Sequence, residues 1–285
     1  AMAPPASAAA NERAEVVRAA RELAYDDYLS ALLAPPRYRG DLITLAAVFG
    51  ELARIPLQVS DATLGEIRLQ WWRDALTSDA RSGHPVADAA LALNPRLPKP
   101  LAELIAPFIE ARAAELYAEP FPTAEAFDAY VMAPEKAAFA TRAALLGVQP
   151  DHSPDQSAAP FDAAARTLGL VRTCVRLPHL FAKGRYPLGA ERLGSTGDSD
   201  AIDEHRLRAA MSGLINEAAT AWIALRPSLR RISPDLRRVM VPVALAGPYL
   251  RAIQQPGCDV LRDVADPSPL ERSTKLWLAA RLGRF

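Results

Sequence analysis

Apolar residues recur at helical spacing along almost the whole chain, and this pattern limits the possible folds more than any other feature of the sequence. From Asn11 onward they return every three or four residues, and no segment shows the sustained alternation of a half-buried strand. The 25 prolines mostly fall between these periodic stretches, where a proline does not break a helix. We therefore predict an all-α protein.

The same pattern gives approximate helix boundaries. Helices are predicted at residues 11–33, 40–55, 61–78, 98–118, 123–131, 134–147, 160–182, 200–225, 234–254 and 267–281. The longest irregular stretches, residues 149–159 and 183–200, do not separate segments of different composition. We expect one helical domain over residues 11–285, preceded by a disordered Ala/Pro/Ser-rich segment at residues 1–10.

Composition and charge argue against several classes of protein. Lys+Arg and Asp+Glu are equal at 33 each, so nucleic acid is not an expected partner. Cys174 and Cys258 stand alone, without the spacing of a metal site. No apolar run approaches the roughly 20 residues that span a bilayer, and the N-terminal residues lack a secretory pattern. We expect a cytoplasmic protein with at most peripheral contact with the inner membrane.

Familiar catalytic and metal-binding motifs are missing from the sequence. It contains no G-x-S-x-G, no P-loop and no G-x-G-x-x-G. The histidines are scattered without the spacing of metal ligands on a helix: His84, His152, His179 and His205. We predict no catalytic set, no metal site and no cofactor.

Residues 60–77 form the most clearly defined helix, with Ser60 as its expected N-cap. It carries two apolar stripes, one of Leu64, Ile67, Trp71 and Ala75 and the other of Leu69, Trp72 and Leu76. Arg68 projects among these apolar residues, so we predict that it is buried, either paired with an internal acid or in contact with an anionic ligand. Trp71 is interpreted as a core residue, with a ligand contact as the alternative.

This segment, GEIRLQWWRDAL, and the upstream phrases YDDYLSALLAPPRYRGDLITL and LAAVFGELARIPLQVSD resemble the squalene/phytoene synthase family. The resemblance runs from about Asp26 to the C-terminus and is specific over Tyr38–Leu76. It implies the all-helical isoprenoid synthase fold, a barrel of helices around an apolar cavity. In active members, two aspartate-rich motifs at the cavity mouth hold magnesium ions that bind an isoprenyl diphosphate.

Neither aspartate-rich motif is recognisable in this sequence. In register with the family pattern, the acid positions of the first motif hold Ala53, Arg54 and Leu57. The region of the second motif, residues 163–190, contains no Asp or Glu. The pattern most resembles the branch of the family that includes the mitochondrial complex I assembly factor, in which the motifs have degenerated. Asp26 and Asp27 resemble the N-terminal helix of the family and not a metal site.

Basic residues stand where the second motif is expected: Arg166, Arg172, Arg176, Lys183 and Arg185. Arg172 and Arg176 lie at i, i+4, so they share one helix face. Two interpretations remain open, a solvated face or a cavity mouth where they join Arg54 and bind a phosphate or carboxylate without metal. The candidate ligand-binding residues are Arg54, Arg68, Trp71, Arg172, Arg176 and Arg185.

Three functions are compatible with these observations. The missing acids favour a non-catalytic family member that assists assembly of a respiratory membrane complex, complex I, through protein contacts or a lipid-like ligand. One alternative is an active prenyltransferase that condenses two isoprenyl diphosphates. The other is a metal-free carrier of an isoprenoid or lipid phosphate.

Overall fold

The computed structural model describes residues 6–148, 158–194 and 202–285. Of the residues in these ranges, 75% are helical and none belongs to a strand; one isolated bridge connects Phe121 and Gly189. The all-α prediction is therefore confirmed. No helix in these ranges combines the length and apolar character needed to cross a membrane.

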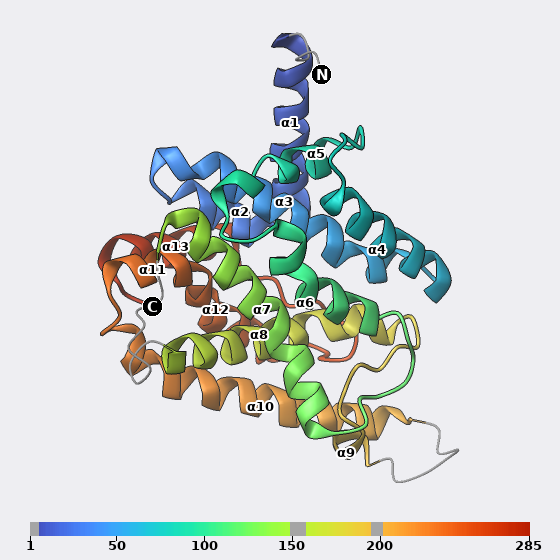
Figure 1. Ribbon diagram of the computed structural model, residues 1–285. Coiled ribbons are helices and arrows are strands. Elements are labelled where there is room, and N and C mark those ends of the chain that lie inside the picture. The colour runs from blue at the N-terminus through green and yellow to red at the C-terminus, as the bar shows by residue number, and fades with distance from the viewer. Residues whose placement is uncertain (1–5, 149–157, 195–201) are drawn as a thin grey trace.

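The helices follow one another along the chain as labelled in Figure 1. They are α1 (Ala6–Leu23), α2 (Tyr25–Leu32), α3 (Pro36–Gln58), α4 (Ala62–Thr77), α5 (Pro85–Leu91), η1 (Asn94–Arg96), α6 (Leu101–Ala114), α7 (Ala124–Leu146), α8 (Ala158–Phe181), α9 (Ala190–Leu193), α10 (Glu204–Leu229), α11 (Pro234–Met240), η2 (Val241–Leu245), α12 (Ala246–Ile253) and α13 (Pro269–Leu282).

Several boundaries differ from the sequence prediction. The first predicted helix is split at Ala24, whose φ of −143° and ψ of 54° are not helical. The N-cap of α4 is Asp61, not Ser60, because its carboxylate accepts the main-chain N–H of Thr63 at 2.7 Å. The predicted break before Pro134 is wrong, since α7 continues through this residue. Burial of α7 against α6 and α8 offsets the roughly 3 kcal/mol that an interior proline costs.

Two predicted irregular regions and the N-terminal segment fall partly outside the described residues. α1 already begins at Ala6, so only residues 1–5 of the predicted disordered segment lie outside the description. Residues 149–157 and 195–201 also lie outside it, and the short helix α9 occupies part of the predicted loop 183–200.

Helix α8 occupies the middle of the molecule, packed between α7 and α10 (Figure 1). Apolar side chains form two large buried clusters, one mainly within α1 to α7 and one mainly around α8, α10 and α12. The crossing of α7 and α8 is very close, because a Cβ atom on Gly169 would lie 2.2 Å from the carbonyl oxygen of Val131. The absence of a side chain at Gly169 therefore allows the two helices to approach this closely, beside the cavity that both of them line.

Candidate functional site

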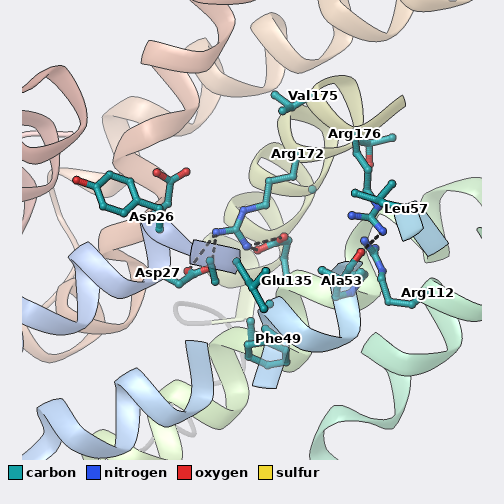
Figure 2. Close-up of a pocket in the computed structure, with 18 of the residues that line it drawn as sticks. Asp26, Asp27, Phe49, Ala53, Leu57, Arg112, Glu135, Arg172, Val175 and Arg176 are labelled. Carbon is teal, nitrogen blue, oxygen red and sulfur yellow. Dashed lines mark hydrogen bonds and ion pairs between the residues drawn. The ribbon is translucent and has the colours of Figure 1, made fainter. Parts of the chain in front are cut away.

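A cavity of about 510 Å³ lies among α2, α3, α6, α7 and α8, and residues from the C-terminal helices complete its wall (Figure 2). A cavity of this size is within the range of small-molecule sites. Apolar and charged side chains both face it, and they come from segments far apart in the sequence.

The wall formed by α3 is apolar. Phe49, Ala53 and Leu57 succeed one another at i, i+4 and i+8, so they share one helix face, and all three line the cavity. Ala53 and Leu57 stand at positions where the family resemblance predicts metal-binding acids. Arg54 does not line this cavity, and its guanidinium pairs with Glu51 at 2.7 Å.

The wall formed by α8 is cationic. Arg172 and Arg176 both line the cavity (Figure 2), so they do not lie on a solvated outer face. The opposite stripe of this helix, which includes Leu170, Cys174 and Leu177, is buried in the core as the spacing predicts. The two arginines are thus directed inward, as the second interpretation of the sequence requires.

Arg172 is held between two carboxylates from different helices. Its Nη2 lies 3.0 Å from Oδ2 of Asp27 on α2, and its Nη1 lies 3.0 Å from Oε2 of Glu135 on α7. Burial opposes the positive charge, but the negative charges of Asp27 and Glu135 more than compensate and raise the pKa of Arg172. Burial also raises the pKa of Glu135, and Arg172 counteracts that rise.

Asp26 belongs to a second group of charges in the same cavity. Its Oδ2 accepts a hydrogen bond from the hydroxyl of Tyr249 at 2.6 Å, and its Oδ1 lies 3.3 Å from Nη1 of Arg272. Arg272 also pairs with Asp266. Burial raises the pKa of Asp26, while the Tyr249 hydroxyl and the Arg272 guanidinium act in the opposite direction.

Arg176 belongs to a third group, in which two guanidinium groups share one carboxylate. Its Nε donates to Glu115 Oε2 at 2.6 Å, and Nη1 of Arg112 lies 3.0 Å from Glu115 Oε1. The hydroxyl of Tyr130 also donates to this carboxylate, at 2.8 Å. Glu115 is fully buried, and burial lowers the pKa of Arg112. The Nε of Arg112 is buried without a hydrogen-bond partner, so this group carries one unbalanced positive charge and a free donor.

The donor chemistry of this cavity does not fit the magnesium ions that the family resemblance implies. Magnesium takes oxygen ligands, chiefly carboxylates and water. The cavity faces of α3 and α8 offer aliphatic and guanidinium side chains at the expected positions, and the carboxylates described above are bound to arginines. Within the described ranges, no group of three His, Cys, Asp or Glu side chains is arranged to hold a metal ion.

The sequence interpretation missed the acids that pair with these arginines. The family resemblance places Asp27 only in the N-terminal helix, and it points to neither Glu115 nor Glu135. Both glutamates are buried in the structure. Glu135 is the only acid between Asp128 and Leu146, and an isolated acid on a mainly apolar helix is a signal in the sequence, because a buried carboxylate requires a partner. Glu115 has Glu110 and Glu119 nearby, so it does not stand out in the sequence.

The remaining candidate residues lie elsewhere. The prediction that Arg68 is buried is wrong, because the stripe of Leu64, Ile67 and Trp71 beside it is exposed while the other stripe of α4 is covered. Arg68 and Trp71 line a separate cleft together with Arg54. Arg185 is buried and binds main-chain carbonyl groups at the end of α3: those of Pro56 at 2.6 Å, Val59 at 3.1 Å and Ser60 at 3.2 Å. It therefore satisfies the terminal carbonyls of this helix.

Comparisons with known proteins agree with this architecture. The crystal structure of a dehydrosqualene synthase in complex with ligand has a TM-score of 0.63 and 14% identity, and covers 97% of this chain and 98% of that chain. Squalene synthase HpnC from Alicyclobacillus acidocaldarius has a TM-score of 0.61 and 15% identity, and covers 88% and 95%. At such identities the likeness concerns the fold alone. No curated protein sequence matches significantly.

A model of one protein family matches most of the chain. It is described as squalene/phytoene synthase, and the match covers residues 20–272. This range includes both helices that carry the expected metal positions, α3 and α8, and all three charged groups of the cavity. The chain belongs to the squalene/phytoene synthase family.

Proposed function

We propose that this protein is a non-catalytic member of its family, which binds a lipid-like anion in the cavity without metal and assists assembly of a membrane-bound respiratory complex, complex I. It acts from the cytoplasm, with at most peripheral contact with the inner membrane.

The observation that carries the proposal is the contact between Arg176 and Ala53. Nη2 of Arg176 donates to the main-chain oxygen of Ala53 at 2.5 Å, so a cation connects α8 to α3 across the cavity (Figure 2). These helices correspond to the two that hold magnesium in active relatives, by the resemblance of the sequence. A guanidinium here repels a divalent cation and attracts an anion. This arrangement opposes metal-assisted departure of diphosphate.

The same region supports binding of an anionic head group. Arg112 and Arg176 share the single carboxylate of Glu115, and the Nε of Arg112 has no partner. A guanidinium group can donate two parallel hydrogen bonds to two oxygens of one phosphate or carboxylate. The apolar wall of Phe49, Ala53 and Leu57 stands next to this charge and offers a surface for a hydrocarbon tail.

The assembly role rests on resemblance and on an exposed surface. The branch resemblance comes from the degenerate aspartate-rich motifs, and the exposed surface lies on α4, where Leu64 and Ile67 are exposed by 53% and 60%. Apolar side chains exposed next to one another favour contact with another protein. In cells that lack the protein, we expect less assembled complex I on native gels, restored by the natural chain and not by a Leu64→Asp, Ile67→Asp double variant. Normal complex I in the deficient cells would contradict this role.

The ligand and the catalytic question are tested on the purified protein. Incubation with farnesyl diphosphate and magnesium should release no diphosphate, while an active synthase of the family, assayed in parallel, releases it. Calorimetry with farnesyl phosphate in the presence of a chelator should show binding that weakens with salt. Because each charge-assisted hydrogen bond contributes about 1.5–3 kcal/mol, Arg176→Gln should weaken binding by at least about tenfold.

Two controls keep the result specific. Arg226→Gln changes an exposed arginine on α10 that lines neither pocket described here, so it should leave the affinity unchanged. A thermal melt of each variant separates lost binding from lost folding. If the protein releases diphosphate and a chelator of magnesium stops the release, the protein is an active prenyltransferase and the proposal is wrong. Equal affinity in the Arg176 and Arg226 variants would remove the proposed head-group site.

A further inference from the structure

A second cleft, of about 390 Å³, lies between α3 and α4 on the side of α3 away from the cavity. Its lining residues on α3 are Glu51, Arg54, Ile55 and Gln58, those on α4 are Arg68, Trp71 and Trp72, and His84 completes it. On each helix these residues stand three or four apart, so one face of α3 looks toward one face of α4. Figure 1 shows α4 at the edge of the molecule. Arg68 and Trp71, two of the residues that line the cleft, are exposed to solvent.

One wall of the cleft is aromatic. The rings of Trp71, Trp72 and His84 contact one another edge to face, with centroids 5.3 to 5.5 Å apart. Trp72 is buried, whereas Trp71 is 40% exposed and lines the cleft. An exposed indole held in place by two neighbouring rings offers a rigid surface for a flat apolar group.

Hydrogen-bond donors dominate the polar part of the cleft. Arg54 is balanced by Glu51, but Arg68 has neither an ion pair nor a hydrogen bond to any residue that the structure describes. Nδ1 of His84 accepts the main-chain N–H of Ala87 at 3.4 Å, so in the neutral ring the proton is on Nε2 and is free to donate. A cleft with one unbalanced cation and additional donors is complementary to an anion.

We propose that this cleft is a second ligand site, which binds a small organic anion made of a flat apolar ring and a carboxylate or phosphate group. The ring lies against Trp71, and the anionic group is held by Arg68 and the Nε2–H of His84. The proposal does not depend on the function of the larger cavity, because the two sites use opposite faces of α3 and have no lining residue in common.

The test uses the indole N–H resonances of the full chain labelled with ¹⁵N, which contains four tryptophans. Three probes share one ring system: 2-naphthoate, 2-naphthyl phosphate and neutral 2-naphthol. We expect the resonances of Trp71 and Trp72 to shift saturably with the two anions, and the tighter of the two identifies the preferred anionic group. Loss of one charge-assisted contact in Arg68→Gln should weaken binding by at least about tenfold.

Matched variants decide whether the cleft is responsible. Arg226→Gln on α10 and Arg176→Gln in the cavity should both leave naphthyl binding unchanged, which separates this site from the one proposed above. The proposal is wrong if naphthol binds as tightly as the two anions. It is also wrong if the Arg68 and Arg226 variants bind the anions with equal affinity. Shifts produced only by an acidic amphipathic peptide, and by neither naphthyl anion, would also overturn it and indicate a protein contact.

Discussion

Arg172 on α8 and Asp27 on α2 form a two-point ion pair, in which Nη2 of the arginine lies 3.1 Å from Oδ1 and 3.0 Å from Oδ2 of the aspartate. The two residues are 145 positions apart in the chain. Since Glu135 on α7 binds the same guanidinium, one side chain connects three helices around the cavity. Charges of this cavity therefore also hold the fold together.

Removal of this guanidinium should destabilise the protein. In Arg172→Ala, Asp27 and Glu135 lose their shared partner, and the Glu135 side chain is only 5% exposed. Leaving a buried charge unpaired costs about 3 kcal/mol or more in the free energy of unfolding. Urea unfolding measures the loss, and Arg226→Ala is the exposed control. A loss below about 0.5 kcal/mol, typical of a surface site, would show that the pairing contributes little.

Asp26 should make the stability depend on pH. Burial raises its pKa above the unfolded value of about 3.9, so the folded state binds the proton more tightly. Its favourable contribution is then complete below the unfolded pKa and is lost as pH rises through the folded pKa. The Asp26→Asn side chain cannot ionise, so the unfolding free energy of this variant relative to the natural chain should increase as the pH rises above about 4. A flat Asp26→Asn series would contradict the expectation.

Two adjacent residues of α4 should respond in opposite ways to truncation. Arg68 is exposed, so Arg68→Ala should change the unfolding free energy by no more than about 0.5 kcal/mol. Leu69 is fully buried, and Leu69→Ala should cost about 2–5 kcal/mol because it leaves a cavity. Thermal melts of both variants suffice. A large loss in Arg68→Ala would mean that this arginine has a structural partner after all.

Because α7 and α8 approach closely at Gly169, adding one methyl group at this position should lower the free energy of unfolding. In Gly169→Ala the new Cβ would lie 2.2 Å from the Val131 carbonyl, so the helices must separate, at a cost of about 1–3 kcal/mol. Gly213 on α10 is the matched control, because no atom beyond its chain neighbours and the nearby backbone of its own helix lies within 4 Å of its Cβ position. Because alanine has a better helix propensity than glycine, Gly213→Ala should stabilise the protein by up to about 1 kcal/mol. Denaturation of both variants tests the contrast, and equal effects would contradict the packing argument.

Helical periodicity determined the helix content, because a helix that buries one face repeats its apolar residues at a fixed local spacing. Local spacing also placed Phe49, Ala53 and Leu57 on one face, and this face lines the cavity. The family resemblance then supplied the fold, which the match over residues 20–272 confirms. The helix content and the shared helix face depend on residues within a few turns of one another, whereas the fold was inferred from a resemblance over most of the chain.

Tertiary structure alone decided which faces are covered and which charges meet. The sequence of α4 contains two apolar stripes, and only the position of its neighbours leaves Leu64 and Ile67 exposed and Arg68 in solvent. Likewise, Arg172 and Arg176 share a helix face by their spacing, but their carboxylate partners come from α2, α7 and the end of α6. Ion pairing depends on distances in space, and helical spacing does not specify the distance between residues on different helices.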